Sequence, residues 1–240
     1  MLLHGLTYDR RQWDPLLREL AIADPGRRTL ALDLPGHGDA PRRGTYRLAE
    51  VAEVIHDQVK AAGLTEPVVV GHSVGGLIAT VYAARYPARA VVNLDQPLLP
   101  GPFGAIVRAA EPRLHGPDWR QVWDGMLAGM GIADLPAGVR ALAETATDPR
   151  PDLLLGYWDE LIHGTDEQLA AERRRDLRAI RERAVGYRWV TRSEPSARYL
   201  SWLTAALPEV VVTVLPGGHF PHLAQPAVLA RMLAAPGPRP

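Results

Sequence analysis

The stretch PVVVGHSVGGLIATVYAARY, residues 67–86, decides the fold. It begins with a short β-branched run, passes through glycines and continues as an alanine-rich apolar segment that Pro87 ends. It therefore predicts a strand, a sharp turn and a helix. The turn carries the pattern G-x-S-x-G from Gly71 to Gly75, which is informative because of this strand–turn–helix setting. Such a turn raises the Ser73 hydroxyl above the end of the sheet, and side chains at the two glycines would crowd it.

Ser73 is the candidate nucleophile of this turn. It would lie at the start of a helix, where backbone amides and the helix dipole favour developing negative charge. A serine hydroxyl is inert at its ordinary pKa and needs an adjacent base. The segment LPGGHFPH, residues 215–222, follows the last expected strand, and its two glycines would let a loop carry His219 to Ser73. His219 is therefore the candidate base, and His222, at the expected start of a helix, is assigned a structural role.

A second short motif, LHGL at residues 3–6, complements the serine turn. Acyl transfer passes through a tetrahedral oxyanion, which preorganised amide donors stabilise by several kcal/mol. A turn of the type H-G-x after a strand supplies one such donor, here the amide of Leu6. The amide of Val74, directly after Ser73, supplies the other. The sequence therefore predicts an oxyanion hole formed by Leu6 and Val74.

The rest of the chain alternates strand-like and helix-like segments, which is typical of an α/β fold with a mostly parallel sheet and helices on both faces. Strands are expected at 29–34, 90–94, 187–191 and 210–215, and helices at 48–62, 196–207 and 227–234. Residues 97–185 hold no convincing strand but several helix candidates, which we expect to be broken by Pro112, Pro117, Pro136, Pro149 and Pro151. We therefore expect a core domain of residues 1–96 and 186–240, with a helical insertion at 97–185.

Composition excludes several classes of function. The formal net charge of +0 gives no basic excess for nucleic acid or an anionic membrane, and no apolar run reaches the ~20 residues of a membrane helix. The absence of cysteine removes disulfides, thiolate metal sites and a cysteine nucleophile. No histidine pair has metal-binding spacing with a nearby acid, so no metal is expected. Without a signal-peptide pattern, we expect a cytoplasmic protein acting on a small molecule, and the oligomeric state stays open.

Four motifs together resemble the α/β-hydrolase superfamily: H-G at 4–5, D-L-P-G-H-G-D at 33–39, G-H-S-V-G-G at 71–76 and G-G-H-F-P-H-L at 217–223. The resemblance covers nearly the whole chain, with the insertion matching only in position, as a lid. It implies the hydrolase fold, a lid over the active site and the roles given above for Ser73, His219, Leu6 and Val74. Serine rather than aspartate at the nucleophile position argues against the haloalkane dehalogenase and epoxide hydrolase branches.

The acid that would orient His219 has two candidates, each after an expected strand. Asp95 follows the strand at 90–94, and Glu194 follows the strand at 187–191. Most relatives place this acid after the later strand, often as G-x-x-D, but here that segment reads TRSE at 191–194. Some branches place it after the earlier strand. Asp95 is preferred, and Glu194 stays as the alternative.

The chain also departs from the family at its start. Relatives usually carry two or more strands before the H-G turn, whereas this sequence has only residues 1–3 there. The N-terminal strands of the fold are therefore expected to be missing. Because an exposed apolar strand edge promotes aggregation, we hypothesise that the native protein begins upstream of Met1.

These features favour a serine hydrolase that cleaves a small ester, thioester, lactone or amide through an acyl-enzyme on Ser73, with no cofactor. The same site would also serve C–C hydrolysis, acyl transfer or perhydrolysis, and the motifs do not separate these reactions. A catalytically silent ligand receptor on the same fold is disfavoured by the intact Ser73 and His219. The tryptophans and methionines of the insertion suggest an apolar substrate group.

Overall fold

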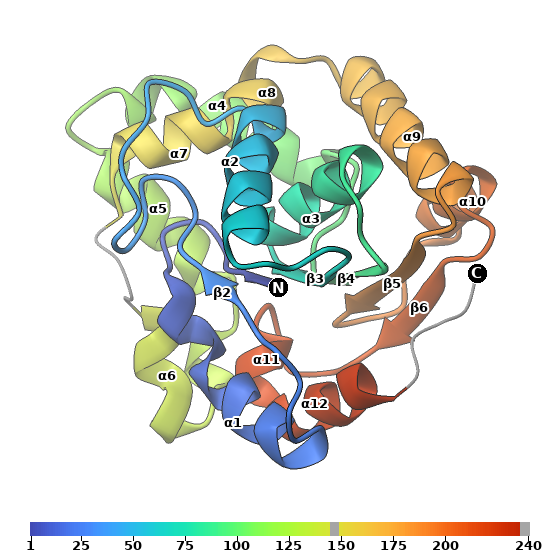
Figure 1. Ribbon diagram of the computed structural model, residues 1–240. Helices are drawn as coiled ribbons and strands as arrows, with labels where there is room; N and C mark the ends of the chain where they lie inside the picture. Colours follow the sequence, from blue (N-terminus) through green and yellow to red (C-terminus); the bar gives the residue numbers. More distant parts are fainter. Residues whose placement is uncertain (145–148, 236–240) are drawn as a thin grey trace.

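The computed structural model describes residues 1–144 and 149–235. They form a six-stranded sheet in the order β2-β1-β3-β4-β5-β6, and every neighbouring pair is parallel (Figure 1). The strands are β1 (Leu2–Leu3), β2 (Ala31–Leu32), β3 (Val68–His72), β4 (Ala90–Leu94), β5 (Gly186–Thr191) and β6 (Val211–Val214). The predicted α/β fold with a parallel sheet is confirmed, although β2 covers only two residues of the strand expected at 29–34.

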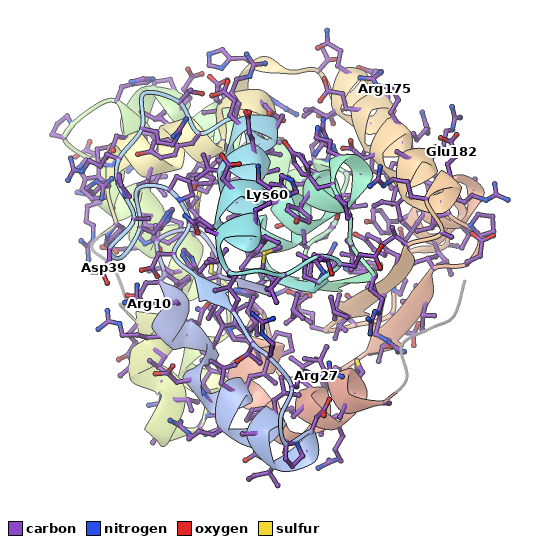
Figure 2. The ribbon with its side chains drawn as sticks, in the orientation of Figure 1. Arg10, Arg27, Asp39, Lys60, Arg175 and Glu182 are labelled. Carbon is purple, nitrogen blue, oxygen red and sulfur yellow. The ribbon has the colours of Figure 1, made fainter. Side chains whose placement is uncertain are left out.

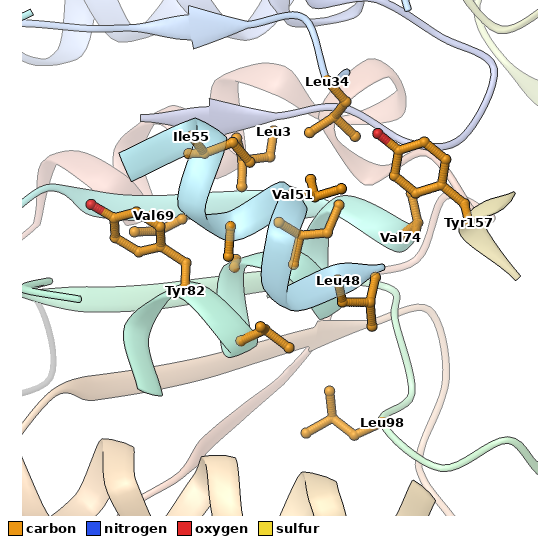
Figure 3. Close-up of a cluster of buried hydrophobic side chains, with 14 of the residues drawn as sticks. Leu3, Leu34, Leu48, Val51, Ile55, Val69, Val74, Tyr82, Leu98 and Tyr157 are labelled. Carbon is orange, nitrogen blue, oxygen red and sulfur yellow. The ribbon is translucent and has the colours of Figure 1, made fainter. Parts of the chain in front are cut away.

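Helices cover both faces of the sheet, as Figure 1 shows. One face carries α1 (Asp14–Ala23), α11 (Pro221–Ala224) and α12 (Pro226–Ala234), and the other carries α2 (Leu48–Ala61), α3 (Val74–Arg85), α9 (Asp166–Glu182) and α10 (Ala197–Ala206). Alternate residues of β3 enter opposite hydrophobic clusters: Val69 packs with Val51 and Ile55 of α2 (Figure 3), and Val70 packs with Leu16 of α1. Burial on both faces explains why β3 and β4 are apolar apart from His72 and Asn93.

The described residues of 97–185 form helices and no strand, as expected. In chain order they are α4 (Gly101–Leu114), α5 (Trp119–Ala128), the 3₁₀ turn Ile132–Asp134, α6 (Ala137–Glu144), α7 (Pro151–Tyr157), α8 (Asp159–His163) and α9. The expected break at Pro112 is wrong, because this proline lies inside α4. It stands in the last turn of the helix, where the missing N–H removes a single hydrogen bond. Since α9 packs against α3, the end of this segment contributes to the cover of the sheet.

The turn between β3 and α3 is packed backbone against backbone. A methyl group on Gly71 would lie 2.1 Å from the Gly75 carbonyl oxygen, and one on Gly75 would lie 2.3 Å from the Leu3 carbonyl oxygen. Neither contact can be relieved by rotating a side chain. The G-x-S-x-G turn therefore has glycines because its backbone touches itself and the end of β1.

We expect Gly75→Ala to lower the free energy of unfolding by at least about 2 kcal/mol, because the added methyl group must displace backbone atoms. Gly44→Ala is the matched control, since nothing lies within 4 Å of a methyl group there. It should change stability by less than about 0.5 kcal/mol. Urea unfolding of both variants measures the difference, and equal stability of the two would contradict the close packing described here.

Candidate active site

Ser73 occupies a strained position between β3 and α3. Its φ of 52° and ψ of −128° lie outside the regions that non-glycine residues usually adopt. The backbone around it holds this conformation: its N–H donates to the Leu94 carbonyl at 3.0 Å, and its own carbonyl accepts from Gly76 at 2.7 Å. Strain of this kind costs about 1–3 kcal/mol and persists only where the surroundings enforce it. The residue stays partly exposed although both of its neighbours in the chain are buried.

His219 and Asp95 meet above the carboxyl ends of the strands. The Nδ1 of His219, in the loop after β6, lies 2.8 Å from Oδ2 of Asp95, which directly follows β4. An ionised carboxylate only accepts, so Nδ1 carries the proton and Nε2 is left as the acceptor. The two side chains are 15% and 6% exposed, which shields their hydrogen bond from water.

Asp95 is itself held in place. It has a φ of 53°, and its N–H donates to the Val190 carbonyl at 2.7 Å. Its Oδ1 accepts from the Arg192 amide at 3.3 Å, while the Arg192 guanidinium lies 3.8 Å from Oδ2. Glu194, the other candidate acid, is exposed in the turn after β5. The structure therefore brings His219 together with Asp95 and not with Glu194.

The backbone of His219 is held from two further directions. Its carbonyl accepts a hydrogen bond of 2.7 Å from Nε2 of the buried His72, the residue before Ser73. Its N–H donates to the Met130 carbonyl, between α5 and the following 3₁₀ turn, at 3.3 Å. The His72 and His219 rings are 4.8 Å apart, so His219 lies beside the serine turn. No hydrogen bond joins the Ser73 hydroxyl to His219 in residues 1–144 and 149–235.

The loop that carries Leu6 lies against the serine turn. A methyl group on Gly5 would be 3.3 Å from Ser73 Cβ and 2.9 Å from His72 Nδ1. In the described part of the chain, the amides of Leu6 and Val74 donate no hydrogen bond. Two unused donors beside a strained serine are the arrangement that an oxyanion hole requires. The structure thus places Val74 directly after Ser73, and Gly5, the residue before Leu6, against the Ser73 side chain.

Two buried histidines tie this loop to the 33–39 turn, which sequence reasoning did not foresee in detail. His4 Nε2 accepts from the Leu34 amide at 2.9 Å, and His37 Nε2 accepts from the Thr7 amide at 3.0 Å. Their positions in turn motifs indicated structural hydrogen bonding but not the partners. Burial lowers the pKa of His4 to about 4 and that of His37 to about 3, so both rings are neutral at physiological pH.

Charged side chains close the same turn at the surface. The Arg10 guanidinium donates to Asp33 and, at 2.6 Å, to Asp39, and the labelled Arg10 and Asp39 lie side by side in Figure 2. Asp33 also accepts from the amides of Arg10 at 2.7 Å and Asp39 at 3.0 Å. Asp33 thus accepts hydrogen bonds from backbone amides of two segments, one at Arg10 and one in the 33–39 turn.

Helix α5 packs over the Leu6 loop. A hollow of about 10 Å³ is lined by Thr7 and Tyr8 from that loop and by Trp123 and Leu127 from α5, together with Arg120, Glu144 and Pro149. This space is about that of a single water molecule. Of the five lining residues that come from 97–185, three are apolar and two are charged.

The parallel sheet and the grouping of Ser73, His219 and Asp95 at its carboxyl edge point to one class of proteins. The sequence profile of the alpha/beta hydrolase family matches residues 1–232. The chain therefore belongs to the α/β-hydrolase family and is an enzyme of that class.

Similar proteins carry different activities. A 2-succinyl-6-hydroxy-2,4-cyclohexadiene-1-carboxylate synthase of Enterobacter sp. (strain 638) is 32% identical over 115 residues, 48% of this chain and 38% of that protein. A pimeloyl-(acyl-carrier protein) methyl ester esterase of Neisseria meningitidis serogroup B is 38% identical over 86 residues, 36% of this chain and 31% of that protein. The matched segments thus span about a third of these relatives.

Solved structures match over nearly the whole chain. AqdC, crystallised as a variant with its substrate, recognises and cleaves the ring of the Pseudomonas quinolone signal. Its structure aligns with a TM-score of 0.79 at 22% identity, covering 97% of this chain and 88% of that one. An esterase of Thermogutta terrifontis aligns with a TM-score of 0.72 at 17% identity, covering 97% and 86%. At these identities the likeness concerns the fold alone.

Two features of residues 1–144 and 149–235 concern membranes and metals. None of the helices is long and apolar enough to cross a bilayer. Among the same residues, no group of three or more histidine, aspartate or glutamate side chains is arranged to hold a metal ion.

The buried histidines make stability depend on pH. Burial lowers the pKa of His222 to about 3, and neither of its ring nitrogens has a hydrogen-bond partner in the described structure. In the unfolded chain a histidine titrates near 6.5, so below that pH the unfolded state binds protons that the folded state does not. Each such histidine therefore removes up to about 1.4 kcal/mol of stability per pH unit as the pH falls from about 6.5 towards its folded pKa.

We expect the free energy of unfolding to fall steeply between pH 6.5 and 4, and His222→Phe to make that fall shallower. Urea unfolding at half-unit pH intervals measures both slopes. His115→Phe, at an exposed histidine, controls for the loss of an imidazole as such. A slope in H222F equal to that of the wild type would contradict the neutral, buried state of His222.

Proposed function

We propose that this enzyme is a serine hydrolase that cleaves a small carboxylic ester, thioester, lactone or amide through an acyl-enzyme on Ser73. The observation that carries the proposal is the 2.8 Å hydrogen bond between His219 Nδ1 and Asp95 Oδ2, beside a strained and partly exposed serine. This bond leaves Nε2 of His219 free to accept a proton. It also favours Asp95 over Glu194 as the third member of the catalytic triad.

The chemistry follows from these roles. The Ser73 oxygen attacks the substrate carbonyl carbon, and His219 Nε2 takes the hydroxyl proton as the bond forms. The amides of Leu6 and Val74 stabilise the oxyanion of the tetrahedral intermediate. The leaving group then departs with the proton from His219, and a water molecule, deprotonated by His219, releases the acid. Asp95 stays ionised and stabilises the imidazolium in both half-reactions.

Residues 97–185 would act as the lid that determines which substrates enter. The tryptophans and methionines of this segment support an apolar group on the substrate. The similarity to a methyl ester esterase supports an ester as the substrate class. C–C hydrolysis, acyl transfer and perhydrolysis are the alternatives on the same residues, because the relatives with similar segments differ in activity.

A fluorophosphonate probe should label the wild-type protein and not Ser73→Ala, because only an activated serine attacks phosphorus. p-Nitrophenyl esters of graded chain length, assayed beside the labelling, identify the preferred acyl group. Labelling without ester turnover would favour one of the alternative reactions. Resistance of the wild type to the probe would favour a ligand receptor and contradict the proposal.

Two conservative variants test the acid. Asp95→Asn should lower kcat about 10³- to 10⁴-fold, because an amide at this place stabilises the wrong tautomer of His219 and no charge faces the imidazolium. Glu194→Gln is the matched control and should stay within about twofold of the wild type, since an exposed surface charge contributes little. The reverse ranking would assign the role to Glu194.

A further inference from the structure

His37 is fully buried and makes two hydrogen bonds that fix its tautomer. Its Nδ1 lies 3.1 Å from the Pro35 carbonyl, and its Nε2 lies 3.0 Å from the Thr7 amide. A carbonyl only accepts and an amide only donates, so the proton must be on Nδ1. The lowered pKa of His37, about 3, is consistent with a ring that stays neutral. The ring therefore clamps the Thr7 amide to the 33–39 turn.

The clamped amide belongs to a strained residue. Thr7 has a φ of 69°, which is unfavourable for a β-branched side chain. The turn around it is closed by a bond of 3.3 Å from the Tyr8 amide to the Gly5 carbonyl. Leu6, whose amide is the proposed oxyanion donor, lies between these anchored residues. The direction of the Leu6 N–H therefore depends on the hold that His37 has on Thr7.

Helix α7 holds the other side of the same turn. The Tyr157 hydroxyl donates to the Pro35 carbonyl at 2.9 Å, the acceptor that His37 also uses. The Tyr157 ring meets His37 edge to face at 5.2 Å and stacks on Tyr46 at 5.0 Å. Figure 3 shows the Tyr157 hydroxyl pointing toward the segment that carries Leu34. A continuous chain of contacts thus runs from α7 through His37 to Thr7.

We infer that His37 is a positioning residue for the Leu6 oxyanion donor. We further infer that Tyr157 makes this positioning depend on the position of helix α7. The inference rests on the proposed function, which gives Leu6 its role. It adds a connection, made only of protein contacts, between helix α7 and the Leu6 amide that is proposed to stabilise the oxyanion.

Three variants separate the contacts. His37→Phe keeps a ring beside Tyr157 but removes both hydrogen bonds. His37→Gln can restore them, because the amide nitrogen donates to Pro35 and the amide oxygen accepts from Thr7. Tyr157→Phe removes only the bond to Pro35. The matched control is Tyr82→Phe, which removes the hydroxyl that a buried tyrosine shares in a hydrogen bond with His56 in α2.

The main readout is the ratio of kcat for an oxygen ester to kcat for the matching thionoester, with each enzyme's active fraction counted by fluorophosphonate labelling of Ser73. Sulfur is a weak acceptor, so displaced oxyanion donors slow the oxygen ester more than the thionoester. A loss of general stability would lower both rates equally and leave the ratio unchanged.

We expect His37→Phe to lower kcat for the oxygen ester about 10- to 100-fold, with a smaller change in KM and a fall in the ratio. His37→Gln should stay within about threefold of the wild type, because it remakes the bonds. Tyr157→Phe should lower the ratio by a smaller factor, and Tyr82→Phe should leave it unchanged.

An unchanged ratio in His37→Phe would overturn the inference. If that variant does not fold, the ratio in Tyr157→Phe decides in its place: a fall supports the inference and an unchanged value overturns it. A wild type that neither hydrolyses esters nor takes the probe would instead overturn the proposed function, and the inference with it.

Discussion

The turn that bears Ser73 rests directly on the end of β1, with backbone touching backbone and no side chain between them. The Leu3 and His4 carbonyl oxygens would lie 2.3 and 2.5 Å from a methyl group on Gly75. This approach sets the distance between Ser73 and the loop of residues 4–7, and hence, in the proposed mechanism, where an oxyanion lies relative to the serine. Loops anchored on β2, β4 and β6 are placed around that fixed contact.

The local parts of this arrangement could be predicted from the sequence, because each is encoded by neighbouring residues. The strand–turn–helix around Ser73 lies within residues 67–86, and the glycine loop before His219 lies within residues 215–222. The acid that pairs with His219, in contrast, lies far from it in the sequence. In the sheet order, β5 lies between β4 and β6, so the loop after β6 must pass the end of β5 to reach Asp95. No pattern in the sequence gives that path, and Asp95 and Glu194 therefore stayed open.

The buried histidines show the same limit. Their motifs mark them as turn residues, but a side-chain bond to an amide about 30 residues away, as between His37 and Thr7, depends on the packing of two loops. The error at Pro112 has a different origin. Proline removes one backbone hydrogen bond and crowds the carbonyl four residues before it, but in α4 the buried residues Val107 and Leu114 on either side of Pro112 hold the helix in place.

Met130 connects the helical segment of residues 97–185 directly to His219. Its carbonyl holds the His219 amide, and the turn after it needs Gly131, whose φ is 74°. A segment exchanged between relatives to alter substrate preference would bring its own helices but would also remove this anchor. In the proposed function, one stretch of chain therefore serves both substrate selection and the alignment of His219, and grafts that keep residues 130–131 preserve a geometry that whole-segment grafts discard.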